Sequence, residues 1–250
     1  MNSLQLTETV GAIAAKNYRT TKAFRQLGID FWHAGNKTLE EAIREAGVTI
    51  EQVKMAVEQS NLPKTSTEQE FNKWDIDPLI DYIINTHHRY AKESAVIIYD
   101  LAQNVAHRHS HKHPELRKLT TALFLFLNDL LNQLKNEEQM LFPNIRQLIK
   151  NKGCREVNTH ATFGFINDSV GKLKKQHLAA GKELKLLRKL TNDYMLPADA
   201  CNSYKFLFEK MKEFENDLFL HVHLENNILF PKATALDEKL TGQERNVETW

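Results

Sequence analysis

The segment from Glu137 to Pro143 reads E-E-Q-M-L-F-P, and the segment from Glu225 to Pro231 reads E-N-N-I-L-F-P. The two copies share the pattern E-x-[QN]-x-L-F-P, and their glutamates are 88 residues apart. Each copy ends a long stretch with helical apolar spacing, so we expect it in the last turns before a proline that kinks or stops the helix. Glutamates repeated at matching helix ends predict paired carboxylates inside a bundle, and buried carboxylates need a partner such as a metal ion.

The regions around this repeat contain four long helical patterns. Capping signals and prolines place these helices at about 77–106, 114–149, 167–190 and 198–230. Four helices of more than twenty residues, each with one apolar stripe, pack most economically as a bundle. The sequence therefore predicts an all-α protein whose main unit is an up-and-down four-helix bundle.

The rest of the chain divides around this bundle. Residues 1–59 predict a small domain of short helices, in which Thr38 and Glu41 form a capping box and Gly47 ends the helix. Residues 60–76 are polar at first, contain a proline and show no period, which is typical of a linker. The bundle then spans 77–234, and 235–250 is expected to be a polar C-terminal tail.

Composition excludes several classes of protein. The 33 Lys and Arg residues balance 32 Asp and Glu residues, which argues against a dedicated nucleic-acid binder. Apolar runs are too short for a membrane span, and the first residues lack the pattern of a signal peptide. The sequence thus predicts a cytoplasmic protein.

Histidines supply the remaining candidate metal ligands. His221 lies one helical turn before Glu225, so both side chains leave the same face of the helix, whereas the first copy has Gln133 at the matching position. In the first long helix the candidate is His87 or its neighbour His88, which point about 100° apart, so that only one can face the core. In the third helix the only histidine is His177.

Several longer segments resemble a known family. They are H-V-H-L-E-N-N-I-L-F-P, N-E-E-Q-M-L-F-P, H-P-E-L at 113–116 and L-T-N-D-Y-M-L-P-A-D-A-C in the bundle, and T-V-G-A-I-A, A-F-R-Q-L-G-I-D-F and K-T-L-E-E-A near the N-terminus. Together they are similar to the iron-sulfur cluster repair di-iron proteins of the RIC, ScdA or YtfE type. In that family a small ScdA-like domain precedes a hemerythrin-like domain, and the resemblance covers about residues 7–234.

The resemblance implies a four-helix bundle that holds a non-haem di-iron centre. Carried over position by position, its metal ligands are two bridging glutamates and three terminal histidines, namely Glu137, Glu225, His87, His177 and His221. Imidazoles and carboxylates suit iron, and bridging carboxylates bring two ions close together.

The chain departs from the family pattern at two places. The family has a histidine where this chain has Gln133, so we expect a modified second iron site with Asp129, one turn earlier, as the alternative to the missing ligand. The family also has Cys-Cys-Gly-Gly in the small domain, where this chain has Trp32, His33, Ala34 and Gly35. A thiol role of the small domain is therefore not expected.

These observations lead to three functional hypotheses. The first is a non-haem di-iron protein that helps repair iron-sulfur clusters damaged by oxidative or nitrosative stress, with damaged iron-sulfur proteins as acceptors. It would act as a repair or metal-donor protein rather than as a turnover enzyme. The second is a protein that binds or senses oxygen or nitric oxide, and the third is an interaction protein with a degraded site. The repair function is implied by the resemblance alone.

Overall fold

The computed structural model of the chain describes residues 4–17, 20–31, 35–60, 70–151 and 165–245. Within these ranges the regular structure is helical, apart from one isolated bridge between Thr9 and Thr38. None of the described helices combines the length and the hydropathy that crossing a bilayer requires. The expected all-α class is confirmed.

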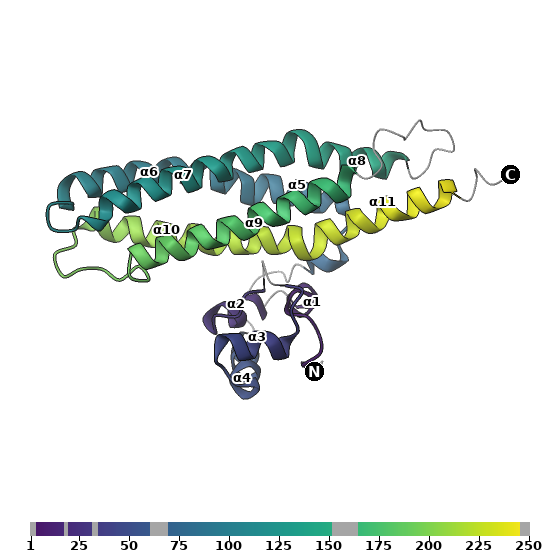
Figure 1. Ribbon diagram of the computed structural model, residues 1–250, viewed down its shortest axis with the longest axis horizontal. Coiled ribbons are helices and arrows are strands. Elements are labelled where there is room, and N and C mark those ends of the chain that lie inside the picture. The colour runs from purple at the N-terminus through teal and green to yellow at the C-terminus, as the bar shows by residue number, and fades with distance from the viewer. Residues whose placement is uncertain (1–3, 18–19, 32–34, 61–69, 152–164, 246–250) are drawn as a thin grey trace.

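Four long rods lie side by side and form the bundle (Figure 1). The first comprises α5 (Ile76–Tyr82), η2 (Ile83–His88) and α6 (Arg89–His109); the second comprises α7 (Glu115–Asn136), η3 (Glu137–Leu141) and α8 (Phe142–Asn151). The third is α9 (Phe165–Leu190), and the fourth comprises α10 (Asn202–Leu224), η4 (Glu225–Leu229) and α11 (Phe230–Arg245). A single 3-10 turn, η1 (Phe71–Lys73), precedes the bundle.

Neither proline of the repeat stops its helix, as expected for Pro143 within the helix predicted at 114–149, but not for Pro231, where the fourth helix was predicted to end at about 230. Both η3 and η4 are π-helical turns, and the N–H of Phe142 donates to the carbonyl of Glu137, five residues earlier. This wider turn starts a new α-helical segment, so that Pro143 falls in the first turn of α8, where a helix does not need the missing N–H. In the same way α11 continues to Arg245, through the region where the sequence predicts a polar tail.

The small domain consists of α1 (Val10–Lys16), α2 (Thr20–Gln26), α3 (Leu39–Ala46) and α4 (Ile50–Ser60). The predicted capping box is present, because the side chains of Thr38 and Glu41 each bond to the backbone N–H of the other residue. Gly47 ends α3 in the left-handed conformation, with φ of 66°. The domain has its own apolar core around Phe24 and Phe31, which accounts for its separate position in Figure 1.

The bundle contains two apolar clusters, one on each side of a polar layer. The first cluster extends toward the α6–α7 connection and includes Leu130, Leu134 and Val222. The second surrounds the opposite half and includes Leu141 and Leu224. The buried polar residues lie between them along the chain, so any charge in that layer is shielded from water on both sides.

A side chain of η4 contributes to the docking of the small domain on the bundle. The amide of Asn227 donates to the carbonyl of Phe31 over 3.0 Å, and its Nδ2 lies 3.0 Å from Nδ1 of His223. Burial lowers the pKa of His223 to about 4, so its neutral ring can accept this hydrogen bond. Gly11 and Gly35 flank the same amide, because a Cβ on either would lie 2.5 Å from Oδ1 of Asn227.

This contact predicts opposite effects for two glycine substitutions. Alanine in an exposed helix position is more stable than glycine by up to about 1 kcal/mol, so Gly171→Ala in α9, where a Cβ meets nothing within 4 Å, should raise the free energy of unfolding. Gly11→Ala in α1 should lower it by about 1–3 kcal/mol, because the new Cβ overlaps Asn227 and the Gly35 carbonyl. Urea denaturation of both variants measures the difference. Stabilisation by Gly11→Ala would show that the amide does not anchor the domain.

Candidate metal centre

Two glutamates are completely buried in the polar layer of the bundle. Glu137 is the first residue of η3 and Glu225 is the first residue of η4, and both are 0% exposed. A buried carboxylate is strongly disfavoured unless positive charge or hydrogen-bond donors surround it. The glutamates of the repeat therefore require partners from the other helices.

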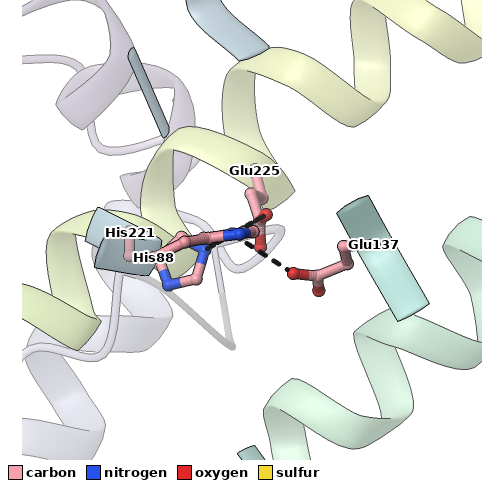
Figure 2. A group of neighbouring side chains, drawn as sticks. All are labelled: His88, Glu137, His221 and Glu225. Atoms are coloured by element: carbon pink, nitrogen blue, oxygen red, sulfur yellow. Dashed lines mark hydrogen bonds and ion pairs between the residues drawn. The ribbon is translucent and has the colours of Figure 1, made fainter. Parts of the chain in front are cut away.

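His88 and His221 face these carboxylates from one side (Figure 2). Nε2 of His88 lies 3.4 Å from Oε2 of Glu137 and 3.8 Å from Oε1 of Glu225. Nε2 of His221 lies 3.2 Å from the same Oε1 of Glu225. We call these residues and the two oxygens the His88–His221 half of the centre.

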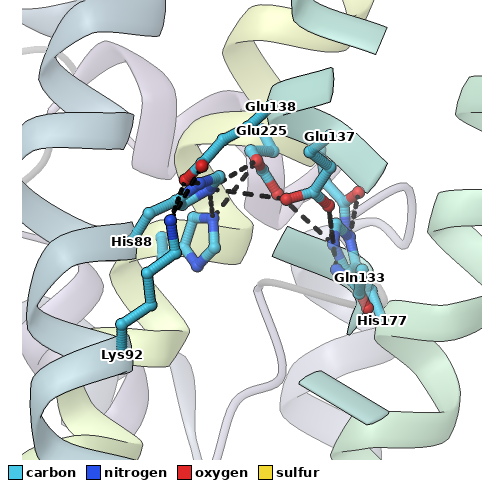
Figure 3. Close-up of polar contacts among 9 residues, drawn as sticks. His88, Lys92, Gln133, Glu137, Glu138, His177 and Glu225 are labelled. Atoms are coloured by element: carbon cyan, nitrogen blue, oxygen red, sulfur yellow. Dashed lines mark hydrogen bonds and ion pairs between the residues drawn. The ribbon is translucent and has the colours of Figure 1, made fainter. Parts of the chain in front are cut away.

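His177 and Gln133 face the other two carboxylate oxygens (Figure 3). Nε2 of His177 lies 3.3 Å from Oε2 of Glu225 and 3.8 Å from Oε1 of Glu137. The amide of Gln133 donates to this Oε1 over 2.9 Å. In this His177–Gln133 half, as in the first, each glutamate contributes one oxygen. Both carboxylates are thus placed to bridge two ions.

The geometry of the His88–His221 half fits a cation. One ligand atom from each of His88, Glu137, His221 and Glu225 lies within 4.8 Å of the others. The Nε2 atoms of the two histidines are 3.1 Å apart, close to the roughly 3 Å expected for two imidazoles bound at right angles at about 2.1 Å from one metal ion.

Unpaired polar atoms provide a second test of the fit. Among the described side chains, Oε2 of Glu137, both carboxylate oxygens of Glu225 and Nε2 of His177 are buried without a hydrogen-bond partner. Such atoms are rare in folded proteins unless they bind an ion or water. The donor set of imidazole nitrogens and carboxylate oxygens, all directed to one place, fits a non-haem iron centre.

The pKa values show the same demand for positive charge. Burial opposes protonation of His177, yet the adjacent carboxylates of Glu137 and Glu225 raise its pKa to about 10. Burial would raise the pKa of Glu225, but the neighbouring imidazoles, with His221 first, hold it well below its ordinary range. Without a cation, protons on His88 and His177, whose pKa values are both raised, supply compensating charge, so cation binding must release protons.

The residue after each glutamate orients a histidine ligand from another helix. Oε1 of Glu138 lies 2.8 Å from Nδ1 of His88, and Glu138 also accepts two 2.7 Å bonds from Lys92 (Figure 3). Oδ1 of Asn226 lies 2.9 Å from Nδ1 of His177. Such contacts fix the ring and the tautomer that exposes Nε2 to the metal position.

The phenylalanines of the repeat pack on the same two histidines. Phe142 stacks on His88 with ring centroids 5.6 Å apart, and Phe230 stacks on His177 at 6.1 Å. These two roles were not among the predictions from the sequence. A signal for them was available, because Phe142 follows Glu138, and Phe230 follows Asn226, by four residues in both copies, which places each pair on one helix face.

The first-helix ligand requires a correction. The structure places His88, and not His87, beside the carboxylates. His87 is also buried, but its Nδ1 lies 2.9 Å from Asp217 and its ring stacks parallel to His221 at 5.8 Å. The reason is local: both residues belong to the π-helical turn η2, whose wider spacing changes which neighbour faces the core.

The structure brings together four of the other predicted site residues. Glu137, His177, His221 and Glu225 all come together in the polar layer. Asp129 is exposed and lies outside the four-residue group, although it lines a cavity with Gln133. Trp32, His33 and Ala34, at the position of the missing cysteines, lie outside the described residues.

The two neighbouring histidines provide a matched pair of substitutions. We expect His88→Gln to lower the affinity for Fe²⁺ by at least roughly 10–100-fold, because it removes an imidazole that faces both carboxylates. His87→Gln should keep the affinity close to that of wild type, since glutamine can still donate to Asp217. Iron counted per chain after dialysis against graded chelator measures both. Loss of iron in the His87 variant alone would restore the assignment made from sequence.

Comparison with known proteins agrees with this geometry. Residues 79–233 match the family described as the hemerythrin HHE cation binding domain, and residues 6–61 match the ScdA_N domain, whose function is described as unknown. The chain is similar to proteins named iron-sulfur cluster repair protein YtfE. The Yersinia pestis protein is 29% identical over 226 residues, and that of Musicola paradisiaca is 28% identical over 228. Each alignment covers 90% of this chain and 96% of the relative. The chain belongs to the hemerythrin HHE family, with an ScdA_N domain ahead of its metal-binding bundle.

Proposed function

We propose that this protein is a non-haem di-iron protein that helps repair iron-sulfur clusters damaged by oxidative or nitrosative stress. Its acceptors are proteins that contain damaged clusters, and its compartment is the cytoplasm. The observation that supports this most is the pair of buried glutamates, each with one oxygen directed to each half of the centre. The relatives named as cluster repair proteins, which align along nine-tenths of the chain, support the choice of process.

The described residues account for how iron is held. Glu137 and Glu225 would hold iron through their carboxylate oxygens, and His88, His221 and His177 would hold it through imidazole nitrogens. Iron bound there would supply one-electron redox chemistry. The apolar clusters on both sides exclude water, and Glu138 with Lys92 fixes the His88 ring. These features favour a rigid site that stores iron and delivers it, rather than a site that binds a large organic substrate.

The two halves of the centre differ in three respects. The His88–His221 half has two imidazoles, whereas the other half has His177 and the neutral amide of Gln133. His88 contacts a carboxylate through Nδ1, and His177 contacts the uncharged Asn226. Gln133 also donates a hydrogen bond to Oε1 of Glu137, an oxygen that an iron ion would need. All three differences weaken the His177–Gln133 half, so its iron is the labile one.

Two observations support the proposed domain division. The small domain, 1–59, has its own core, and every proposed ligand lies in the bundle within 77–234. The residues that replace the family's Cys-Cys motif exclude a thiol reaction at that position. We assign the small domain a docking role and the bundle the iron chemistry.

A repair assay tests the proposal. Full-length protein loaded anaerobically with Fe²⁺ should restore the activity of a hydratase whose [4Fe–4S] cluster has been damaged by nitric oxide. It should do so faster than the same concentration of free Fe²⁺. The control is Glu225→Gln, which keeps the volume of the side chain but removes a bridging charge.

Each other outcome contradicts the proposal in a different way. Iron-loaded protein that restores no more activity than free Fe²⁺ has no repair function. If such protein binds nitric oxide reversibly, it belongs to the gas-binding class. Protein that takes up no iron has a degraded centre.

Introducing a histidine at position 133 should make the iron affinities of the two halves more nearly equal. Gln133→His replaces a neutral oxygen donor with an imidazole one turn before Glu137, matching the relation between His221 and Glu225. We expect the affinity for the second iron to rise about 10-fold or more, on the scale seen when ligand environments are altered. A chelator titration that counts iron per chain in both proteins measures it. Equal and tight binding of two irons by wild type would show that Gln133 does not lower the affinity for the second iron.

A further inference from the structure

Four aromatic rings in contact lead from the surface of the bundle to the His88–His221 half of the centre. The ring centroids of Trp74 and Tyr82 are 5.4 Å apart, and those of Tyr82 and His87 are 5.5 Å apart. His87 stacks on His221 at 5.8 Å, with the two ring planes at an angle of 2°. All three separations lie in the range of roughly 4.5–7 Å that is usual for aromatic rings in contact. We call Trp74, Tyr82, His87 and His221 the aromatic row.

The exposure of the aromatic row falls from one end to the other. Trp74 follows η1 and Tyr82 ends α5, and both side chains are half-buried. His87 and His221 are each 1% exposed. The outer end is held by Lys232, which donates to the carbonyl of Trp74 over 2.5 Å. One end of the row therefore meets solvent, and the other end is a candidate iron ligand.

The hydrogen bond of His87 explains how the two imidazoles keep their parallel arrangement. Nδ1 of His87 lies 2.9 Å from Oδ1 of Asp217, which belongs to α10 and precedes His221 by one helical turn. The carboxylate and the ligand thus leave the same face of one helix. His87 is consequently fixed against His221 by the helix that carries the ligand.

The other two histidine ligands have a different kind of ring behind them. His88 stacks on Phe142 and His177 stacks on Phe230. The benzene ring of phenylalanine is much harder to oxidise than the phenol of tyrosine or the indole of tryptophan. Among the described residues, the ring contacts lead from the centre to tyrosine and tryptophan only through His221. The position of the two oxidisable side chains in the row points to electron transfer.

We propose that the aromatic row carries single electrons from Trp74 to iron bound at His221, so that an oxidant reacting at the centre takes an electron from the protein surface and not from the ligands. The inference rests on the proposed function only in requiring that iron occupies this half. Rings in contact shorten each gap that an electron must cross, and the rate of transfer falls steeply with the width of such a gap.

The electron count is complete for hydrogen peroxide as the oxidant. The O–O bond breaks, and the peroxide takes up two electrons and two protons to leave as two waters. One electron comes from Fe²⁺, which becomes Fe³⁺. Trp74 supplies the other through Tyr82 and His87, and its indole releases the N–H proton to solvent. A soluble thiol then returns one electron and one proton to the indole, and two of the resulting thiyl radicals combine to a disulfide.

A first test uses full-length protein without metal. Trp32→Phe combined with Trp250→Phe leaves Trp74 as the only tryptophan of the chain. Azide radicals from pulse radiolysis oxidise this indole. We expect the absorbance of the indolyl radical to decay as that of a tyrosyl radical rises, at a rate independent of protein concentration. Tyr82→Phe in this background should abolish the transfer, because it keeps the ring and removes the oxidisable phenol.

The matched control for this test is Tyr99→Phe in the same background. Tyr99 also lies in the bundle, but its ring contact is with Phe124 and not with the aromatic row. The control should leave the transfer unchanged. Urea denaturation of both variants checks that the free energy of unfolding is retained.

A second test uses protein loaded anaerobically with Fe²⁺, mixed with equimolar hydrogen peroxide and freeze-quenched. Wild type should show a tryptophan or tyrosine radical by electron paramagnetic resonance, and peptide mass spectrometry should find added oxygen at Trp74. Tyr82→Phe and His87→Gln should lose the radical and should instead gain oxygen at ligand histidines such as His221. His87→Gln keeps the donor to Asp217 and is expected to keep its iron, so loss of the radical there is not loss of metal.

Three results overturn the proposal. The first is transfer from Trp74 that persists after Tyr82→Phe, and the second is equal loss of transfer in the Tyr99 control. The third is oxidation of ligand histidines in wild type to the same extent as in Tyr82→Phe. Wild type that takes up no iron overturns the proposed function together with this inference. Iron-loaded wild type that forms no radical and gains no oxygen at Trp74 overturns this inference alone.

Discussion

Two fully buried carboxylates set the requirements that the rest of this protein meets. Glu137 and Glu225 lie between two apolar clusters, where a negative charge is stable only beside positive charge. Three imidazoles surround them, and a high pKa at His177 shows how strongly the carboxylates draw a proton when no cation is present. Binding of a metal ion satisfies the same requirement with its own charge, so folding of the bundle core and metal binding are coupled.

Each copy of the repeated segment supplies one glutamate of the centre and two side chains that position a histidine. In each copy the glutamate directs one oxygen to each half of the centre, the next residue contacts a histidine of a neighbouring helix, and the phenylalanine stacks on that same histidine. One copy therefore serves His88 and the other serves His177. The correspondence breaks one turn before each glutamate, where His221 is matched by Gln133. The break coincides with the cavity, so the weaker half of the centre is also the half beside an open space.

Much of this was predictable from the sequence, for physical reasons that also explain the exceptions. The repeat and the capping signals indicate a bundle with paired glutamates, and one-turn spacing links His221 to Glu225. Counting at 100° per residue could not decide between His87 and His88, because both lie in a π-helical turn. The same turns carry the helices past Pro143 and Pro231, and the second continuation extends beyond the helix end predicted at about 230. The cavity between α7 and α9 depends on how these two helices align with each other, and this alignment cannot be predicted from the sequence pattern of either helix alone.

The π-helical turns also bear on how such a sequence can change over evolution. Each of η3 and η4 is five residues long and contains one more residue per hydrogen-bonded turn than an α-helix accommodates. Substitutions inside the turn alter one side chain, as the difference between Glu138 and Asn226 illustrates. Loss of a single residue would instead rotate everything beyond it by about 100° relative to the glutamate. In η4 that rotation would carry Asn227 away from the small domain and Phe230 away from His177. The number of residues between the glutamate and the proline is therefore the same in both copies, whereas the identities of the residues between them can change.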